Sequence, residues 1–257
     1  MTYLDSIILG LIQGLTEFLP ISSSGHLVLG QYLLGVKAPG VMFELVVHFG
    51  TLMSVLIYFR KKVFTLVKSV YTPSLRMERL LVFYIILGTI PAVIIGLTFK
   101  GPIERAFASP WIAAVFLIFT GIVLLLTSPF DKGIKRINVT RSIIVGFAQA
   151  LAILPGISRS GMTIAAALFS GVKPMEAAEY SFLLSIPVII GAIVYQANNI
   201  IAVENGLLGH YIVGAAIAFL TGLFAVYILL DLIKKGKFKY FGIYCLVVGM
   251  AGVIYFI

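Results

Sequence analysis

The chain has 257 residues, of which 60% are hydrophobic and only 11% are charged. An average globular protein has about 25% charged residues, so this chain has too few polar side chains to cover a water-facing surface. The composition also excludes a disordered chain, a fibrous repeat and, with a single cysteine (Cys245), a disulfide scaffold. It predicts a polytopic membrane protein, in which the net charge of +9 must be explained by the positions of the basic residues.

In chain order, an apolar stretch over about 6–35 comes first and is interrupted by proline, glycine and serine, as is a second stretch over 142–171. A helix that crosses a bilayer needs about 20 mostly apolar residues. Six uninterrupted runs meet this requirement and are predicted to be transmembrane helices, over roughly 41–59, 80–99, 110–128, 181–198, 211–230 and 241–257.

The basic residues fall mainly in three connections between these runs. If the six runs span and the interrupted stretches do not, fifteen Lys and Arg residues lie on one side and three (Lys37, Lys100 and Arg105) on the other. Cytoplasmic loops carry such an excess, so both termini are predicted to lie outside. The excess charge therefore sets the orientation. Basic patches for nucleic acid are the less favoured explanation, and no nucleic-acid partner is expected.

The two interrupted stretches are predicted to be re-entrant helical hairpins that enter the membrane and return on the same side. They align without a gap at an offset of 136, with 13 identities across the 32 positions of 6–37. Because three spans follow each hairpin, the second half starts from the opposite side of the membrane. The fold is thus predicted to be all-α, a single membrane domain (1–257) with inverted-topology repeats over 1–128 and 142–257.

Each hairpin contains a proline (Pro20 or Pro155) that stops a helix, followed by a serine-rich turn and a second apolar helix. Serine is a good N-cap residue, and the free N–H groups and dipole of a helix start form a natural anion site. If the hairpin tips meet near the midplane, two such sites converge. The capping serines are Ser22, Ser24, Ser158 and Ser160.

Arg159 lies within the second hairpin, far from either flank. An arginine at mid-membrane costs roughly 2.5–3.5 kcal/mol, so it needs a partner or a ligand. The planar guanidinium suits phosphate oxygens, held by two parallel hydrogen bonds. A buried ion pair with Glu17 is the structural alternative.

Glu17 is the other charge within a hairpin, with Gln13 one helical turn before it and His26 just past the serine turn that includes Ser23. A carboxylate, a hydroxyl and an imidazole near one turn can supply a base or metal ligand, a nucleophile and an acid. The repeat mates of Glu17, Ser23 and His26 are Ile153, Arg159 and Met162, so acid–base groups occur in one half and the cation in the other. Phosphoryl chemistry requires such a division, whereas a symmetrical transport pathway does not.

Glu44 and His48, four residues apart at the outer end of the first full span, share a helix face. Two interpretations stay open: both residues line the pocket, or Glu44 simply sits at the membrane interface.

The segments Gln13–His26 and Pro155–Thr163 resemble the two signatures of the undecaprenyl-pyrophosphate phosphatase family, also called the bacitracin-resistance protein family, and the similarity extends along the whole chain. The resemblance implies a hydrolase of the bacterial plasma (inner) membrane that removes one phosphate from a C55 isoprenoid pyrophosphate, recycling the lipid carrier for peptidoglycan synthesis. It also implies a divalent cation, magnesium or calcium, with Glu17 as a tentative ligand. Gln13 stands where many members carry a second glutamate, which leaves open whether this position binds metal or only hydrogen-bonds.

Carried over to matching positions, the resemblance implies that Glu17, Ser23, His26 and Arg159 are catalytic. The residues assigned to substrate binding are Gln13, Ser22, Ser24, Gly25, Ser158, Ser160, Gly161 and Thr163.

The mechanistic hypothesis is attack by Ser23 with help from Glu17, while His26 protonates or positions a group and Arg159 holds the pyrophosphate. Two rivals stay open: His26 as the nucleophile, or a metal-activated water. The alternative function is a transporter or flippase for a phosphorylated lipid or small anion, because inverted repeats with broken helices are typical of transporters. A scaffold or channel subunit would leave Arg159 and Glu17 unexplained, and the sequence leaves a homo-oligomer open.

Overall fold

The computed structural model describes residues 1–36, 40–130, 132–195 and 207–257. Within these ranges the fold is helical and contains no strand, and one short 3-10 helix, η1, covers Ser128–Phe130. The α-helices of the described part are α1 (Tyr3–Phe18), α2 (Ser23–Leu33), α3 (Gly40–Tyr58), α4 (Arg60–Tyr71), α5 (Arg76–Thr98), α6 (Lys100–Phe107), α7 (Pro110–Leu126), α8 (Val139–Leu151), α9 (Arg159–Phe169), α10 (Pro174–Tyr195), α12 (Leu208–Lys234) and α13 (Lys239–Phe256).

The six predicted transmembrane runs coincide with α3, α5, α7, α10, α12 and α13. Four of these helices, α5, α10, α12 and α13, are long and apolar enough to cross a membrane alone. The other two, α3 and α7, meet the same criteria together with α4 and α6, from which they are bent by 82° and 98°. The described residues thus contain four to six candidate spans and confirm a membrane-embedded helical protein. The end of the run 181–198, Lys37 and its neighbours lie outside the described residues.

Both interrupted stretches form pairs of helices broken where the prolines predict. The first helix, α1, ends at Phe18, and Leu19 is extended, as expected for a residue that precedes proline. The turn then passes through Ser22, whose φ of 68° is unusual for a residue other than glycine. The chain is therefore redirected within four residues, and α2 begins at Ser23.

The second break is longer and depends on a glycine. Helix α8 ends at Leu151, and Gly156 in the turn has a φ of 89°. A Cβ atom at Gly156 would lie 2.1 Å from the carbonyl oxygen of Ala113 in α7, so only glycine fits. The backbone of this turn thus packs directly on α7, and α9 begins at Arg159.

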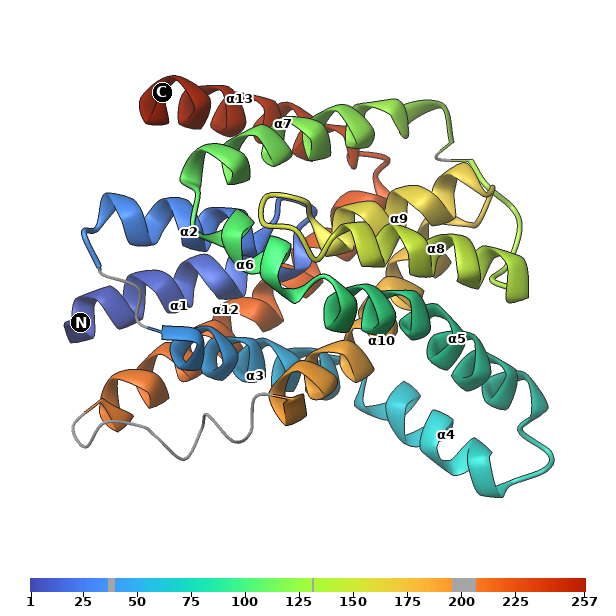
Figure 1. Cartoon of the computed structure of the whole chain (residues 1–257). Coiled ribbons are helices and arrows are strands. Elements are labelled where there is room, and N and C mark those ends of the chain that lie inside the picture. Colours follow the sequence, from blue (N-terminus) through green and yellow to red (C-terminus); the bar gives the residue numbers. More distant parts are fainter. Residues whose placement is uncertain (37–39, 131, 196–206) are drawn as a thin grey trace.

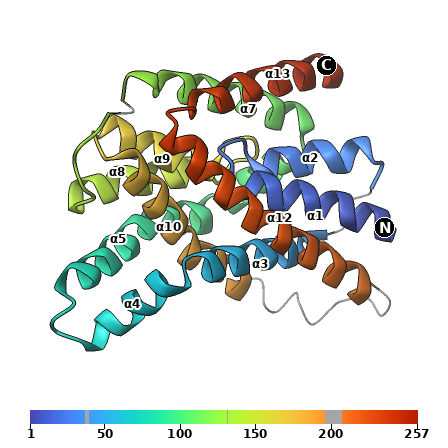
Figure 2. The ribbon, with the colours of Figure 1, turned by 180° about the vertical axis from the view of Figure 1, so that it is seen from behind.

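Figure 1 shows the two helix pairs reaching the middle of the molecule from opposite ends. The α1–α2 pair starts beside the N-terminus, the α8–α9 pair starts at the far end, and the two turns lie close together in the centre. Seen from behind, α12 crosses the molecule diagonally beside α1 and α3 (Figure 2). The approach of α1 to α12 depends on small residues: a Cβ at Gly10 would lie 2.5 Å from the Gly214 carbonyl oxygen.

Both termini lie at the same end of the molecule (Figure 1). The connections that carry most of the basic residues, around α4, between α7 and α8, between α9 and α10 and between α12 and α13, lie toward the other end. The charge asymmetry expected from the sequence is therefore also an asymmetry of the folded chain.

Candidate active site

Two serines fix the helix starts at the hairpin tips in the same way. The Ser22 hydroxyl accepts a hydrogen bond from the Gly25 N–H at 3.2 Å, and the Ser158 hydroxyl accepts one from the Gly161 N–H at 3.0 Å. In each tip a second serine hydroxyl lies 3.3 Å from the capping one. Repeat-related serines thus cap both helices with the same hydrogen-bond pattern, as the sequence predicts, although Ser22 has a positive φ and Ser158 an extended backbone.

The two tips touch each other directly. The Ser160 hydroxyl donates to the Leu19 carbonyl oxygen across the tips at 3.1 Å. A Cβ at Gly25 would lie 2.9 Å from the Gly156 Cα, and a Cβ at Gly161 would lie 3.3 Å from the Pro20 Cβ. The small residues of the two signatures therefore let the tips pack together, and the N-termini of α2 and α9 converge on one region.

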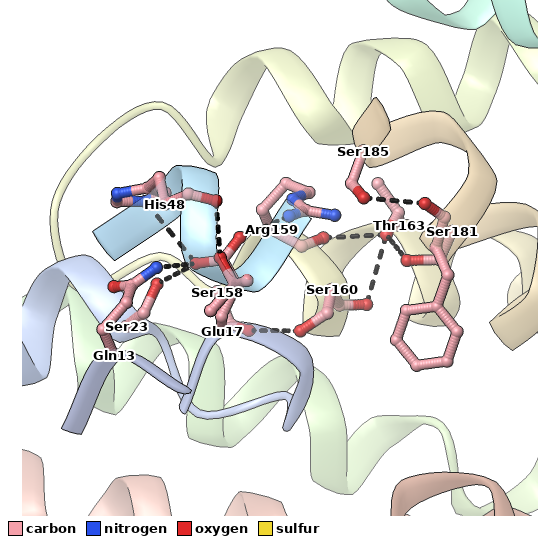
Figure 3. Close-up of polar contacts among 12 residues, drawn as sticks. Gln13, Glu17, Ser23, His48, Ser158, Arg159, Ser160, Thr163, Ser181 and Ser185 are labelled. Atoms are coloured by element: carbon pink, nitrogen blue, oxygen red, sulfur yellow. Dashed lines mark hydrogen bonds and ion pairs between the residues drawn. The ribbon is translucent and has the colours of Figure 1, made fainter. Parts of the chain in front are cut away.

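Glu17 is the centre of the polar contacts between the tips (Figure 3). Its Oε1 accepts from Arg159 Nη2 at 2.5 Å, and its Oε2 accepts from Gln13 Nε2 at 3.0 Å and from Ser23 Oγ at 2.5 Å. Nε2 of His48, from α3, lies 3.5 Å from the same Oε2. One buried carboxylate thus joins a cation, a hydroxyl, an amide and an imidazole from three parts of the chain.

The ion pair that the sequence offered as the structural explanation of Arg159 is present, but it does not satisfy the guanidinium. The Arg159 side chain is 14% exposed, and its Nη1 is buried with no hydrogen-bond partner among the described residues. A buried polar group without a partner is costly and rare in a folded protein. Arg159 therefore has hydrogen-bonding capacity left for a ligand.

A cavity of about 330 Å³ lies against this group. Its polar wall comes from the two tips, α3 and α8, and consists of Glu17, Ser22, Ser23, Ser24, Glu44, His48, Gln149, Ser158 and Arg159. The remaining wall is apolar. A pocket with a few convergent polar groups and a largely apolar lining is the usual form of a small-molecule site.

The cavity lining includes eight of the residues predicted from the sequence: Glu17, Ser22, Ser23, Ser24, Glu44, His48, Ser158 and Arg159. Of the two interpretations of Glu44 and His48, the structure supports the one that placed both in the pocket. The Glu44 carboxylate also accepts a hydrogen bond from Gln31 at 3.1 Å.

The other predicted residues lie behind the lining. Gln13 is fully buried and binds Glu17. The Thr163 hydroxyl bonds the Arg159 carbonyl oxygen at 2.8 Å and the Ser181 hydroxyl at 2.7 Å, which joins the first turn of α9 to α10. With Gly25, Ser160 and Gly161, these residues hold the tips in position.

His26 is placed differently from the expectation that it lies beside Glu17. Its Nδ1 bonds the Ser22 carbonyl oxygen at 2.8 Å, its Nε2 lies 2.9 Å from the Tyr244 hydroxyl, and its ring stacks on the Tyr244 ring. Both ring nitrogens are thus engaged, and His26 is absent from the cavity lining. The imidazole beside Glu17 belongs to His48.

The sequence reasoning did not assign Gln149 to the site, although it is the repeat mate of Gln13. Its Nε2 donates to the Gly88 carbonyl oxygen at 3.3 Å, and within the part of the chain that the structure describes its Oε1 is buried without a partner, as is Oε1 of Gln13. Gln149 could have been predicted as a site residue from the repeat, because its mate Gln13 was already assigned to the site. The apolar lining from α5, α6 and α10 carries no comparable signal.

The described residues contain no group of three or more His, Cys, Asp or Glu side chains that could hold a metal ion. Two carboxylates, Glu17 and Glu44, do line the same cavity. Mg²⁺ in proteins is usually bound by one or two carboxylates together with substrate phosphates. The residues therefore fit a cation that binds together with a phosphorylated ligand.

Fold and site together define a membrane-embedded helical protein with a partly polar cavity at the meeting point of two broken helix pairs. A family model described as "Bacitracin resistance protein BacA" matches residues 6–251. The chain belongs to this family, as the two signatures indicate.

Curated relatives are similar over nearly the whole chain. An undecaprenyl-diphosphatase of Carboxydothermus hydrogenoformans is 43% identical over 97% of this chain and 96% of its own length. The undecaprenyl-diphosphatases of Korarchaeum cryptofilum and Salinibacter ruber are 41% and 39% identical, each over 98% of both chains.

Proposed function

We propose that this protein hydrolyses undecaprenyl pyrophosphate to undecaprenyl phosphate and inorganic phosphate. Similarity to relatives named undecaprenyl-diphosphatase supports this activity. The observation that carries the proposal is Nη1 of Arg159, which is buried at the meeting point of two helix N-termini and has no partner in the described structure. This arrangement is what a pyrophosphate needs in a site from which water is largely excluded.

Arg159 and the two tips bind the terminal phosphate in this proposal. The first N–H groups of α2 and α9 have no partner within their helices, and the dipoles of both helices favour negative charge at these ends. Because Glu17 holds Nη2 of Arg159, the guanidinium keeps a fixed orientation at the cavity wall, and its Nη1 has no other partner among the described residues to compete with a phosphate oxygen. Binding therefore uses groups whose positions are set before the substrate arrives.

Ser23 is the nucleophile. Its hydroxyl already donates to Glu17 Oε2 at 2.5 Å, so the carboxylate can take the proton as the oxygen attacks the terminal phosphorus. The bond from phosphorus to the bridging oxygen breaks, undecaprenyl phosphate leaves, and water then hydrolyses the phosphoserine. A direct attack by water is the remaining rival. Attack by His26 is disfavoured because both of its ring nitrogens are engaged outside the cavity.

His48 acts on Glu17 as a positioning residue. Its Nδ1 donates to the Glu44 carbonyl oxygen at 2.7 Å, which fixes the ring so that Nε2 faces Glu17 Oε2. The carboxylate is held by Gln13 and Arg159 with the His48 ring beside it, and the oxygen that accepts from Ser23 stays directed toward the hydroxyl. His26 keeps the start of α2 docked on α13 through Tyr244.

A divalent cation, magnesium or calcium, belongs to the proposed active complex. Glu17 and Glu44 would hold it together with the pyrophosphate, and the cation would neutralise charge on the phosphate oxygens. Removing divalent ions with a chelator is expected to abolish phosphate release and leave the fold intact, because the contacts of the site do not depend on the ion.

The proposed arrangement in the bilayer is six spans and two re-entrant hairpins in an inverted repeat, with both termini outside, in a bacterial plasma membrane. The entry of the hairpins from opposite ends and the basic connections at one end support this topology. The product would return to peptidoglycan synthesis as the lipid carrier.

Phosphate release from a prenyl pyrophosphate in detergent micelles tests the activity directly, because micelles have no two sides between which a lipid could be transported. We expect release by the wild type and a loss of at least about 100-fold in Arg159→Ala. Arg136→Ala, which removes an exposed arginine outside the cavity, is the matched control and should retain activity. No release from any prenyl pyrophosphate with Mg²⁺ or Ca²⁺ present would favour the transporter interpretation.

A further inference from the structure

The cavity has an apolar wall opposite its polar one. This wall is formed by α5, α6 and α10, with Ala92, Phe107, Val188, Ile189, Ala192 and Ile193 facing the cavity. None of these side chains can bind a pyrophosphate. Ala192 is also exposed, so the cavity reaches the surface of the protein at α10.

A second hollow, the α5–α10 groove, lies on the outer side of the same two helices. It has a volume of about 240 Å³ and is lined by Ile86, Thr89, Ile90, Val93, Ile94 and Pro187. The Thr89 hydroxyl donates to the Ile85 carbonyl oxygen at 2.8 Å, so it is already satisfied within its own helix. The groove therefore offers only apolar contacts to whatever fills it.

The groove and the cavity adjoin. On α5, Thr89 lines the groove and Ala92, one helical turn further on, lines the cavity. On α10, the neighbouring residues Pro187 and Val188 line the groove and the cavity respectively. The two helices are in contact, so the cavity and the groove lie on neighbouring stretches of the same α5 and α10.

Both helices are candidate membrane spans, and the groove lies near the middle of α5. The exposed fractions of Ile86, Val93 and Ile94 are 56%, 48% and 58%, which places the groove on a face that the bilayer hydrocarbon surrounds. A ligand in the cavity can thus extend into the bilayer without passing through water.

We propose that the α5–α10 groove binds the isoprenoid chain of the substrate, while the pyrophosphate occupies the polar cavity. The inference rests on the proposed function and adds where the isoprenoid chain of the substrate binds. A cavity of about 330 Å³ has room for a pyrophosphate and the first carbons attached to it, and a C55 chain must leave it. The adjoining exit has the chemistry of that chain: apolar, open to lipid and free of unpaired polar groups.

Selective obstruction of the groove tests the proposal. Val93→Trp fills it, and Leu97→Trp, one turn further along α5, is the matched control because Leu97 is 57% exposed and lines neither hollow. The measurement is kcat/KM for farnesyl and isopentenyl pyrophosphate in micelles. We expect Val93→Trp to lower the farnesyl-to-isopentenyl ratio about tenfold, mainly through KM, and Leu97→Trp to leave it within about twofold of the wild type.

The same assay distinguishes an error in the proposed chain-binding groove from an error in the proposed hydrolase activity. If the wild type releases phosphate and Val93→Trp leaves the ratio unchanged, the chain lies elsewhere and an ordinary bilayer lipid fills the groove. An equal loss of kcat/KM for both substrates would also contradict chain binding in the groove, since it would mean that the substitution had damaged the cavity. If the wild type hydrolyses neither substrate, the proposed function itself fails.

Photocrosslinking keeps the proposal testable if Val93→Trp does not fold. A prenyl pyrophosphate with a benzophenone at the end of its chain, bound to the wild-type protein, should label peptides that contain residues 86–94 or 187–193. Excess unlabelled farnesyl pyrophosphate should suppress this labelling. Labelling confined to α12 or α13 would overturn the proposal.

Discussion

The two hairpin tips share their serine caps and differ in backbone path and in chemistry. In both, a serine caps the second helix through the N–H group three residues on, and a second serine hydroxyl lies 3.3 Å away. Yet the first tip supplies Glu17 and Ser23, whereas the same positions in the second are Ile153 and Arg159. The serine caps correspond, whereas the side chains that face the site do not.

This difference shows how a repeat can become an asymmetric site. The two helix N-termini converge because the tips pack together, and this requires only the capping serines and the small residues between the tips. In the proposed mechanism the nucleophile and its base come from one half, and the cation from the other. Each part of the comparison can be broken separately, and the expected effects differ in size.

The largest effect should come from removing the nucleophile in the first tip. Ser23→Ala is expected to lower kcat for phosphate release by about 1000-fold or more, because no other hydroxyl in the described structure bonds Glu17. The size-exclusion profile should stay unchanged, since Ser23 lies at the cavity surface. Near-full turnover in this variant would exclude the serine mechanism.

The cation of the second tip should come next. Arg159→Lys keeps the charge and loses the planar fork that contacts Glu17 and a phosphate at the same time, so a loss of about 100-fold in kcat/KM is expected. Steady-state kinetics on one prenyl pyrophosphate measure it. Activity close to the wild type would show that a point charge suffices and that Nη1 is not used.

Substitutions of the two histidines should have different effects, on catalysis for His48 and on the packing of α2 against α13 for His26. His48→Gln is expected to lower kcat about tenfold with little change in thermal stability, because His48 contacts Glu17 at the cavity. His26→Phe should instead lower the melting temperature, because it breaks the contact between α2 and Tyr244. Kinetics and thermal unfolding in the same detergent measure both. The reverse pattern would restore His26 to the active site.

The caps should give the smallest and most similar effects. Ser22→Ala and Ser158→Ala each remove one cap hydrogen bond to the N–H group three residues on, and each should cost about 1 kcal/mol of stability. Thermal unfolding of the two variants compares the stabilities that the two serine caps contribute. A difference of several kcal/mol between the variants would show that the two caps are not equivalent.

Much of this organisation could be predicted from the sequence because it is encoded locally. Apolar runs of about the length of a bilayer predict the spans, and Pro20, Pro155 and the capping serines predict the broken helices. The approach of Arg159 to Glu17 follows from the cost of two unpaired charges within apolar segments. These features need no knowledge of distant contacts.

The positions of the histidines could not be predicted because they depend on packing between distant segments. His26 turns toward Tyr244, which is 218 residues away in the chain, and His48 reaches Glu17 through the packing of α3 on α1 and α12. The apolar wall of the cavity also could not be predicted from the sequence, because side chains that face a cavity and side chains that face lipid have the same composition. Sequence patterns identify the polar exceptions but not the surfaces around them.

The central claim is that the two tips form one catalytic site, and a double-mutant cycle tests it most directly. Phosphate release from one prenyl pyrophosphate would be measured for the wild type, Ser23→Ala, Arg159→Ala and the double variant. If both residues act on the same phosphorus, the double variant should lose little more than the worse single variant, within about tenfold. If the two losses multiply in full, the tips act independently and the claim is wrong.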